Sequence, residues 1–596
     1  MSRWCSRRVE HLSDGPSACR CGEPFAGTTL LTIRVMFRPR FMKGYDAVLR
    51  LLASGDVGTI FTLLSEDTMQ LVSTLDHEWG DDIGMIDVRH EQGALAMADG
   101  YARATGRIGV CLVGRGPAIA QTGTASVTAR KNGSNVLVIV PETPLKDDYD
   151  VKEFEQESYL RSTIGNVISI RSHETLCSDF REALRRVKAG NGPIAVQISW
   201  DLLDSEMDVS EDKFFDRTSE LTSGPSRGRV RPDADRIEQA IKLYVDSNAH
   251  QPPLIIAGRG AIEADAKGVI EEFAERTSAL LATTLQARGY FSDHPYYLGF
   301  TGSWGRTIAN KYATESNIVF AVGASLNPYT TDKGRLFDED ATVIQIDEDP
   351  SSIGRYTDIS LGIHGDALLT IDALIEELRR LDIDRAGELW SDDLRAELET
   401  APAMSDRIFP EVPGTIDPRD LVRTMDELLP TDRTVVCGSG HYTRWVLDGI
   451  HADPDDFTYA GDFAAIGLGL PMAIGAAAAM NNKMCIAICG DAGLMMSIQE
   501  LETAVRNEIP LMIVVLNDSS LGAEYHSLDS VIGDGEVALV EAPDFADVAN
   551  SFGAEGFTVR SIDELDALAD RISNRPTGPM VVDCKVNHEV RHRSKL

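Results

Sequence analysis

Two acidic residues follow two apolar segments whose spacing suits neighbouring strands of one sheet. Residues 484–489 are apolar and lead into Asp491, and residues 511–516 lead into Asp518. A strand that passes through a glycine-rich turn into a helix offers backbone N–H groups to a phosphate. An acid beside a phosphate is unfavourable unless a cation lies between them, and Mg²⁺ binds both carboxylate and phosphate oxygens. The sequence therefore predicts that Asp491 and Asp518 share one cation. The simpler alternative is an acidic turn that caps a helix.

Short apolar runs alternate with helix-like stretches along most of the chain, which predicts parallel sheets covered by helices. Residues 204–232, rich in Asp, Glu, Ser, Gly and Arg, and residues 382–417, with three prolines, break this alternation and are expected linkers. The predicted fold class is α/β, with three doubly wound parallel-sheet domains over residues 42–205, 230–385 and 415–588. The strand candidates are residues 59–64, 85–87, 109–113, 136–140, 194–198, 253–257, 318–322, 343–347, 434–437, 484–489, 511–516 and 580–583.

The composition of the 596 residues narrows the classes of partner. The chain is strongly acidic, with 93 Asp and Glu against 57 Lys and Arg. Such a surface would repel the phosphates of nucleic acids and anionic lipids, so neither is an expected partner. No run approaches the roughly 18 apolar residues that suggest a membrane span, which predicts a soluble protein. Six of the nine cysteines are scattered without ligand-like pairing, so we expect reduced, buried thiols in a cytoplasmic protein.

Residues 1–41 differ from the rest of the chain, because they are rich in arginine and hold three of the nine cysteines. A zinc site would need four ligands, and Cys5, Cys19, Cys21 and His11 match no recognised spacing. A targeting leader would need an apolar core with a small-residue cleavage site, and none is clear here. We expect a disordered extension or an over-long start, with folded structure from near residue 42.

The two acidic turns resemble the diphosphate motif of thiamine-diphosphate enzymes, which is Gly-Asp-Gly followed at matching spacing by Asn-Asn. Here the motif reads Gly-Asp-Ala-Gly over residues 490–493 and then Asn517-Asp518. Ala492 replaces a family glycine, and Asp518 replaces the second asparagine. The resemblance covers residues 42–588 and is closest to acetolactate synthase and its relatives. It implies the domain order pyrimidine-binding, central and diphosphate-binding, with thiamine diphosphate and Mg²⁺ as cofactors.

The resemblance also implies the metal ligands. Those carried over are the side chains of Asp491 and Asp518 and the carbonyl oxygen of Ser520, with Asn517 as the alternative if the register slips by one. Two aspartates bring more negative charge to the ion than an Asp–Asn pair. This charge could strengthen metal binding, but it adds repulsion with the diphosphate.

A second, distant segment resembles the part of the family that bears the activating glutamate. Residues 88–94 read Val-Arg-His-Glu-Gln-Gly-Ala and precede an alanine-rich stretch through Arg103. In the family this glutamate hydrogen-bonds N1′ of the cofactor aminopyrimidine, which implies that role for Glu91. The chemistry suits an acid in an apolar setting, since burial raises its pKa towards neutrality. The alternative is a glutamate favoured at a helix start by the helix dipole.

Other site residues are implied by the same resemblance. Gly116 and Pro117 stand in a turn that lines the family site, Ile466 is the candidate wedge that bends the cofactor, and Gln156 is a candidate active-site residue on the substrate side. The cofactor-binding candidates are Gly116, Pro117, Gln121, Ser439, His441, Ile466, Gly490, Asp491, Ala492, Gly493, Asp518, Ser520, Leu521 and Gly522.

The central region leaves FAD binding open. Residues 344–350 and 365–367 are typical of the acetolactate synthase group, but residues 325–334 depart from the Arg-Phe-Asp-Asp-Arg run of its flavin-containing members. The family assembly, in which Glu91 and Asp491 of different subunits meet at one cofactor, implies a homodimer or homotetramer.

The resemblance implies decarboxylation of a 2-oxo acid such as pyruvate, followed by addition to an acceptor carbonyl. Two alternatives stay open. One is a 2-oxo acid decarboxylase that performs no carboligation. The other is a non-catalytic homologue that binds the cofactor, which Ala492 and Asp518 favour. A scaffold with neither motif in use would require both matches to be coincidental.

Overall fold

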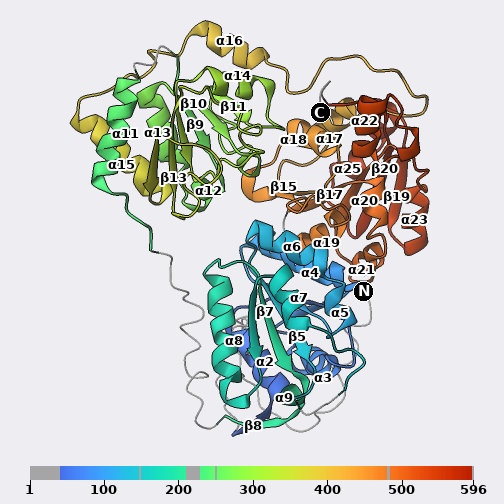
Figure 1. Ribbon diagram of the computed structural model, residues 1–596. Helices are drawn as coiled ribbons and strands as arrows, with labels where there is room; N and C mark the ends of the chain where they lie inside the picture. The colour runs from blue at the N-terminus through green and yellow to red at the C-terminus, as the bar shows by residue number, and fades with distance from the viewer. Residues whose placement is uncertain (1–39, 146–148, 210–227, 248–250, 480–482, 593–596) are drawn as a thin grey trace, which may run out of the picture.

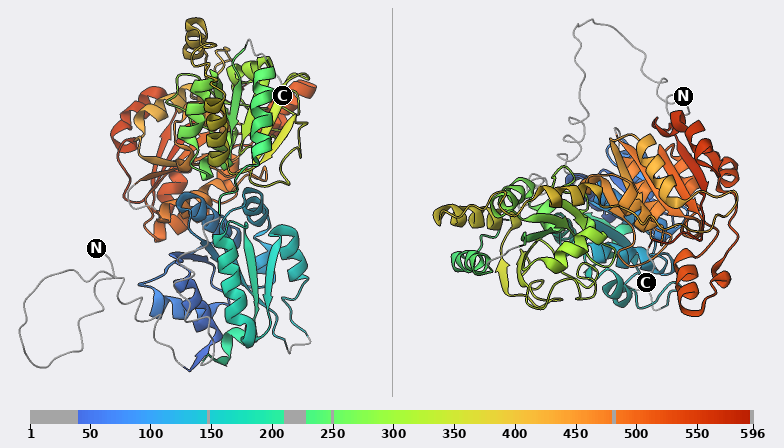
Figure 2. Two further views of the ribbon diagram at one scale, coloured as in Figure 1. Left: turned by 90° about the vertical axis from the view of Figure 1, so that its left-hand side faces the viewer. Right: turned by 90° about the horizontal axis from the view of Figure 1, so that it is seen from above.

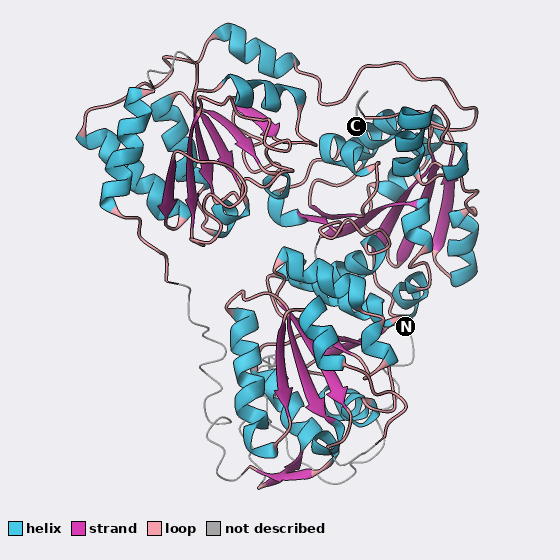
Figure 3. Ribbon diagram, in the orientation of Figure 1, coloured by secondary structure: helices cyan, strands magenta, loops and turns pink. Residues whose placement is uncertain are grey.

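The computed structural model describes residues 40–145, 149–209, 228–247, 251–479 and 483–592. Three six-stranded parallel sheets form three domains (Figure 1). Figure 3 shows helices on both faces of the sheets, as expected because a parallel sheet must bury both faces. The prediction of an α/β fold with three parallel-sheet domains is confirmed. Residues 1–39 of the expected extension, with their cysteines, lie outside the described residues.

The N-terminal domain carries the strand order β3, β2, β4, β5, β7, β6. These strands are β3 (Gly84–Asp87), β2 (Thr59–Thr62), β4 (Gly109–Leu112), β5 (Val136–Glu142), β7 (Ile194–Ser199) and β6 (Asn166–Ile170). The helices are α2 (Gly44–Ser54), α3 (Met69–Thr74), a π-helical turn (Leu75–Trp79), α4 (Glu91–Thr105), α5 (Pro117–Ala120), α6 (Gly123–Asn132), α7 (Gln156–Thr163), α8 (His173–Lys188) and α9 (Trp200–Asp204). Its central strands β4 and β7 are buried along their whole length, which explains their unbroken apolar runs.

The central domain has the order β11, β10, β9, β12, β13, β14. These strands are β11 (Tyr297–Phe300), β10 (Leu280–Thr283), β9 (Leu254–Ala257), β12 (Ile318–Val322), β13 (Thr342–Asp347) and β14 (Leu361–His364). The helices are α11 (Ala234–Asp246), α12 (Arg259–Glu263), α13 (Lys267–Thr277), a 3₁₀ turn (Leu285–Ala287), α14 (Thr307–Glu315) and α15 (Ala367–Arg380). The chain order reverses between β9 and β12, which makes the carboxyl ends of these two strands the switch point of the sheet.

The C-terminal domain has the order β16, β15, β17, β18, β20, β19. These strands are β16 (Phe457–Tyr459), β15 (Arg433–Cys437), β17 (Met484–Gly490), β18 (Leu511–Asn517), β20 (Pro579–Lys585) and β19 (Glu555–Val559). The helices are α17 (Pro418–Leu428), α18 (Thr443–Gly449), α19 (Gly469–Ala479), α20 (Asp491–Met495), α21 (Glu500–Arg506), α22 (Gly522–Ile532), α23 (Phe545–Phe552), α24 (Ile562–Ala567) and α25 (Ala569–Ile572), with 3₁₀ turns at Pro454–Asp456 and Glu536–Ala538.

Helices α4 and α19 cross at very short range and join the N-terminal domain to the C-terminal domain (Figure 1). A Cβ placed on Gly475 would lie 1.9 Å from the Met97 carbonyl oxygen, and one on Gly100 would lie 2.0 Å from that of Met472. Only glycine permits this approach. The two domains share one apolar core at the crossing, and the left view of Figure 2 shows the N-terminal domain in blue below the other two. The helix that begins at Glu91 is therefore packed against the C-terminal domain of its own chain.

The structure corrects three local expectations. The first expected linker begins with a strand, β8 (Glu206–Asp208), which pairs with β1 (Phe41–Lys43). The second contains helix α16 (Asp392–Thr400), on the outside of the central domain in Figures 1 and 2. The third expectation was a glycine-rich turn that leads into one helix, but helix α20 begins at Asp491 and a turn separates it from α21. Asp491 is thus the first residue of a helix rather than part of a preceding loop.

Candidate functional site

The carboxyl ends of β17 and β18 bring Asp491 and Asp518 to one edge of the C-terminal sheet. The strands are paired in register from Ile486 to Gly490, so the residues that follow them lie side by side. Asp491 is 4% exposed and Asp518 is 7% exposed. The Asp518 Oδ1 atom accepts hydrogen bonds from the backbone N–H of Ser520, at 3.0 Å, and from its hydroxyl, at 2.9 Å. Both hydrogen bonds use Oδ1, so Oδ2 of Asp518 takes no part in them.

Burial makes this pair of carboxylates electrostatically costly. Desolvation, and then the charge of Asp518, raises the pKa of Asp491 to about 7, and desolvation also raises the pKa of Asp518. The nearest imidazole, His441, has its Nε2 atom 3.4 Å from Oδ2 of Asp518. Burial lowers the pKa of His441 to about 4, so this ring is neutral near pH 7 and does not compensate the two acids. A divalent cation between the carboxylates would remove the repulsion.

The side chain of Asn517 makes hydrogen bonds within the protein. Its amide nitrogen donates to Oδ1 of Asp583 at 3.0 Å, and its oxygen faces the backbone N–H of Ser519 at 3.3 Å. This engagement favours Asp518 over Asn517 as the metal ligand. Among the described residues, no group of three or more His, Cys, Asp and Glu side chains converges on one point. A metal here would therefore complete its coordination with the Ser520 carbonyl, phosphate and water oxygens.

Two glycines leave room around the carboxylates. A Cβ on Gly522 would lie 2.1 Å from His441, and one on Gly490 would lie 2.8 Å from the ring of Tyr442. Ile466 is half-buried, and a Cβ on Gly493 would lie 3.8 Å from its Cβ, so this candidate wedge borders the turn after β17. The Ser439 hydroxyl lies 3.3 Å from that of Tyr459. Ala492 is half-buried and Leu521 is 38% exposed beside the same turns.

The N-terminal domain supplies the other group of candidates. Glu91 is the first residue of α4 and is half-buried. Gly116 has a φ of +64°, a conformation that favours glycine, and its N–H donates to Oε1 of Gln156 at 3.2 Å. The Gln156 amide also donates to the Pro141 carbonyl at 3.0 Å, so this buried side chain braces the turn of Gly116. Pro117 begins α5, and exposed Gln121 follows that helix.

The two groups remain separate within one chain. In the described part of the chain, no hydrogen bond or ion pair joins Glu91, Gly116 or Gln156 to the carboxylates at the ends of β17 and β18. Among these described residues, the two groups of candidates are therefore not in direct polar contact within one chain.

Arg115 and Glu500 are among the buried charged groups that sequence reasoning missed. Arg115 is 5% exposed, and its guanidinium binds Asp67 at 2.9 Å and also Asp150. Glu500 is fully buried at the start of α21. The helical period gives a signal for Glu500, because it lies one turn before the buried residue Ala504 on the same face. No local signal marks Arg115, whose acidic partners are 48 and 35 positions away.

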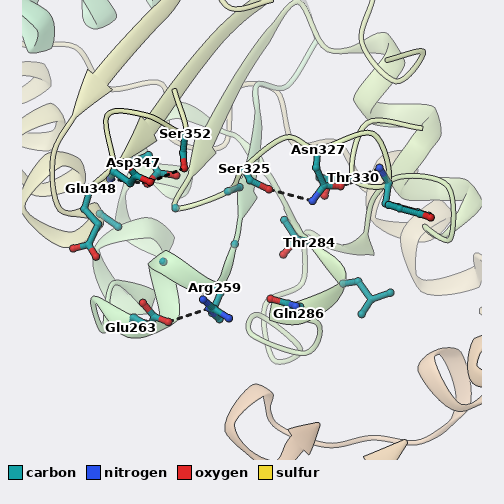
Figure 4. Close-up of a pocket in the computed structure, with 18 of the residues that line it drawn as sticks. Arg259, Glu263, Thr284, Gln286, Ser325, Asn327, Thr330, Asp347, Glu348 and Ser352 are labelled. Carbon is teal, nitrogen blue, oxygen red and sulfur yellow. Dashed lines mark hydrogen bonds and ion pairs between the residues drawn. The ribbon is translucent and has the colours of Figure 1, made fainter. Parts of the chain in front are cut away.

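A cavity of about 1,200 Å³ opens at the switch point of the central sheet and reaches residues 459–464 of the C-terminal domain. Figure 4 shows Asp347 and Glu348 on one side and Arg259 on the other, paired with Glu263 at 3.0 Å. Its other described cations are Lys131 and Arg229. The described charged residues lining the cavity are Lys131, Arg229, Arg259, Glu263, Asp347, Glu348, Asp349, Asp366 and Asp462.

The cavity offers little positive charge to a flavin diphosphate. Arg229 pairs with Asp366 at 3.3 Å, so two of the three described cations are already bound to carboxylates. Among the described charged residues that line the cavity, carboxylates outnumber cations. The residues present do not fit FAD well, in keeping with the departure over residues 325–334.

Comparison with known proteins agrees with this architecture. Three models of the thiamine pyrophosphate enzyme family match, namely its N-terminal TPP binding domain at residues 42–162, its central domain at residues 247–374 and its C-terminal TPP binding domain at residues 438–584. The chain belongs to this family of thiamine pyrophosphate enzymes. Similar curated proteins include acetolactate synthase large subunits and a putative thiamine pyrophosphate-containing protein of Bacillus subtilis.

Three such relatives are similar over nearly the full chain. The acetolactate synthase isozyme 2 large subunit of Escherichia coli is 28% identical, covering 92% of this chain and 96% of its own length. The acetolactate synthase large subunit of Parasynechococcus marenigrum is 28% identical, covering 90% and 87%. A protein of Methanocaldococcus jannaschii named as a probable acetolactate synthase large subunit is 29% identical, covering 90% and 91%. The chain is thus a thiamine-diphosphate-dependent enzyme close to acetolactate synthase.

Replacing Asp518 by Asn should stabilise the metal-free protein at pH 8, because one of two repelling buried charges is removed. The folded pKa of Asp491 is about 7 and an unfolded aspartate has a pKa of about 3.9, so the native state binds more protons between these values. Wild-type stability should therefore rise as pH falls from 7 towards 4. We expect the variant to melt about 2–4 °C higher at pH 8 and at the wild-type temperature at pH 5. A lower melting temperature at pH 8 would contradict the assigned repulsion.

Proposed function

We propose that this protein uses thiamine diphosphate and Mg²⁺ to decarboxylate a 2-oxo acid, with pyruvate as the first substrate to test, and to join the remaining fragment to an acceptor carbonyl. The observation that carries the proposal is the buried, uncompensated pair Asp491 and Asp518 at adjacent strand ends. The names of the relatives support the acetolactate synthase type of reaction. The residues present fit a diphosphate-bound Mg²⁺, since two carboxylates and a carbonyl supply oxygen ligands and a glycine-rich turn leaves space for phosphate.

Different residues would bind the two ends of the cofactor. Asp491, Asp518 and the Ser520 carbonyl would hold Mg²⁺, while Ile466 would support the bent form of the cofactor. Glu91 would hold and transfer a proton at N1′ of the aminopyrimidine. Once bound, thiamine diphosphate would supply a nucleophilic carbon and an electron sink for the loss of CO₂. The protein contributes binding, orientation and proton transfer rather than the carbon chemistry itself.

We further propose a homodimer as the minimum assembly, with a homotetramer also compatible. The family resemblance supports this assembly, since it implies that Glu91 and Asp491 of different subunits meet at one cofactor. The six described cysteines are all buried, which supports a reducing, cytoplasmic setting. Across the described residues, no helix is long and apolar enough to cross a membrane. FAD is left out of the proposed function because of the charges in the central cavity.

Incubating the protein with thiamine diphosphate, Mg²⁺ and carboxyl-labelled pyruvate tests the reaction. We expect labelled CO₂ together with a coupled 2-hydroxy-2-methyl-3-oxo acid or, with an added aldehyde, a hydroxyketone. Release of CO₂ with free acetaldehyde and no coupled product would instead indicate the non-carboligating decarboxylase. No CO₂ from pyruvate or from a panel of other 2-oxo acids, despite bound cofactor, would indicate a non-catalytic homologue.

A further inference from the structure

Glu500 carries a carboxylate that the proposed reaction does not use. It is fully buried in the C-terminal domain, in the first turn of α21. Its Oε2 atom accepts a hydrogen bond from the Thr503 hydroxyl at 2.8 Å. The same oxygen accepts the backbone N–H of Arg89, at 3.2 Å, which belongs to the N-terminal domain. The carboxylate therefore bridges two domains of one chain.

The carboxylate lies against the beginning of α4. Arg89 directly precedes His90, which is the N-cap residue, and Glu91 is the first helical residue. A Cβ placed on Gly93 would lie 2.5 Å from Oε1 of Glu500. The glycine at this position thus lets the carboxylate approach the first turn of the helix. Glu91 lies in sequence between Arg89, whose N–H donates to Glu500, and Gly93, which Glu500 approaches closely.

The N-terminus of a helix is a favourable place for this charge. The first N–H groups of a helix have no intrahelical acceptor and carry a partial positive charge. His90 satisfies one of them, because its Nδ1 accepts the N–H of Gln92 at 3.1 Å. The backbone N–H groups of Arg89 and His90 both lower the pKa of Glu500, against a larger rise caused by burial. Glu500 therefore binds, from another domain, the backbone that leads directly into α4.

The side chain of Arg89 is not the partner of Glu500. Its guanidinium pairs with Glu502 on the surface of α21, with an Nη2–Oε1 distance of 2.7 Å. Two acids of one helix thus hold the same residue in different ways: Glu502 binds the side chain in a solvent-exposed pair, and Glu500 binds the backbone in a buried one. Exposed pairs of this kind contribute little to stability, whereas a buried charge is retained only with well-placed donors.

We propose that Glu500 is a positioning residue for Glu91: by accepting the backbone N–H of Arg89 and lying closely against Gly93, it fixes the start of α4 and the direction of the proton-transferring carboxyl. This inference rests on the proposed function. A displacement of about 1 Å at a reacting group can cost about 100-fold in rate. Holding the first turn of α4 from the C-terminal domain would prevent such a displacement, since the end of a helix is otherwise free to fray.

The test compares Glu500→Gln with Glu502→Gln in the full-length protein saturated with thiamine diphosphate and Mg²⁺. A glutamine keeps the volume of Glu500 but removes the negative charge, so it is a weaker acceptor for the Arg89 N–H and the Thr503 hydroxyl. The readout is exchange of the C2 hydrogen of the bound cofactor with D₂O, measured by quenched flow and NMR, beside cofactor affinity and melting temperature. We expect exchange to slow by about 10- to 100-fold in Glu500→Gln and to stay at the wild-type rate in Glu502→Gln.

The outcomes separate this inference from the proposed function. If wild-type protein binds no thiamine diphosphate or shows no accelerated exchange, the proposed function fails. If wild-type protein exchanges rapidly and Glu500→Gln matches it at full occupancy, the positioning role is overturned. Should Glu500→Gln fail to fold, Thr503→Val removes only the hydroxyl that orients the carboxylate. It should slow exchange by a smaller factor with unchanged cofactor affinity, and a wild-type exchange rate in it would equally overturn the role.

Discussion

Replacing Glu91 by Gln should lower kcat by about 10²- to 10⁴-fold, the usual contribution of a positioned acid–base group. The amide has nearly the same shape and can still accept or donate a hydrogen bond, but it cannot take up and return a proton at N1′. We therefore expect the affinity for thiamine diphosphate to change by only a few-fold. Steady-state kinetics and calorimetric titration of the purified variant would measure both quantities.

A matched control tests whether Glu91 is only a favourable helix-start acid. Glu174 is exposed in the first turn of α8, in the same domain, and its N–H is capped by Ser172. Glu174→Gln should leave kcat unchanged. Equal turnover in Glu91→Gln and Glu174→Gln would show that the helix dipole explains both residues and would remove Glu91 from the mechanism.

Replacing Asp491 by Ala should weaken Mg²⁺-dependent binding of thiamine diphosphate by more than about 100-fold. Partners that merely orient a metal ligand are worth roughly 10- to 100-fold in metal affinity, so loss of a ligand itself should cost more. The variant also lacks the carboxyl whose pKa the charge of Asp518 raises, so the repulsion between the two acids is removed. Calorimetric titration at several Mg²⁺ concentrations would measure the loss.

Asp534 provides the control for this change. It is an exposed aspartate of the same domain, in the turn after α22. Asp534→Ala should bind thiamine diphosphate as the wild-type protein does. If Asp491→Ala retained wild-type affinity and the same dependence on Mg²⁺, Asp491 would not be a metal ligand, and the acidic-turn alternative would explain the sequence motif.

Much of the fold could be predicted from the sequence because the central strands of a parallel sheet are buried on both faces. Strands such as β12 and β13 are near-continuous apolar runs, and their expected positions agree with the structure to within one residue. The edge strands β6 and β19 were not predicted, since polar residues such as half-buried Asn166 and exposed Glu555 interrupt the apolar pattern. Short apolar runs such as β10 also follow a helix so closely that periodicity cannot separate them.

Some residues of the candidate site could be predicted from the sequence, and others could not. Asp491 and Asp518 could be brought together by sequence reasoning because each follows a strand, and parallel neighbours end at one edge. The contact of Glu500 with Arg89 joins residues 411 positions apart, and nothing local to either segment reveals it. Likewise, the hydrogen bond from Asn517 to Asp583 can be recognised only once the pairing of β18 with β20 is known. Long-range pairing thus decides which polar residues remain available to a ligand.

Calorimetric titration of thiamine diphosphate into the full-length protein, with and without Mg²⁺, tests the central claim most directly. The account predicts saturable binding of one cofactor per chain that requires the divalent ion, with weaker binding below neutral pH as Asp491 takes up a proton. Absence of binding at saturating Mg²⁺, or binding of equal strength with the ion chelated, would contradict a cofactor held through metal by Asp491 and Asp518.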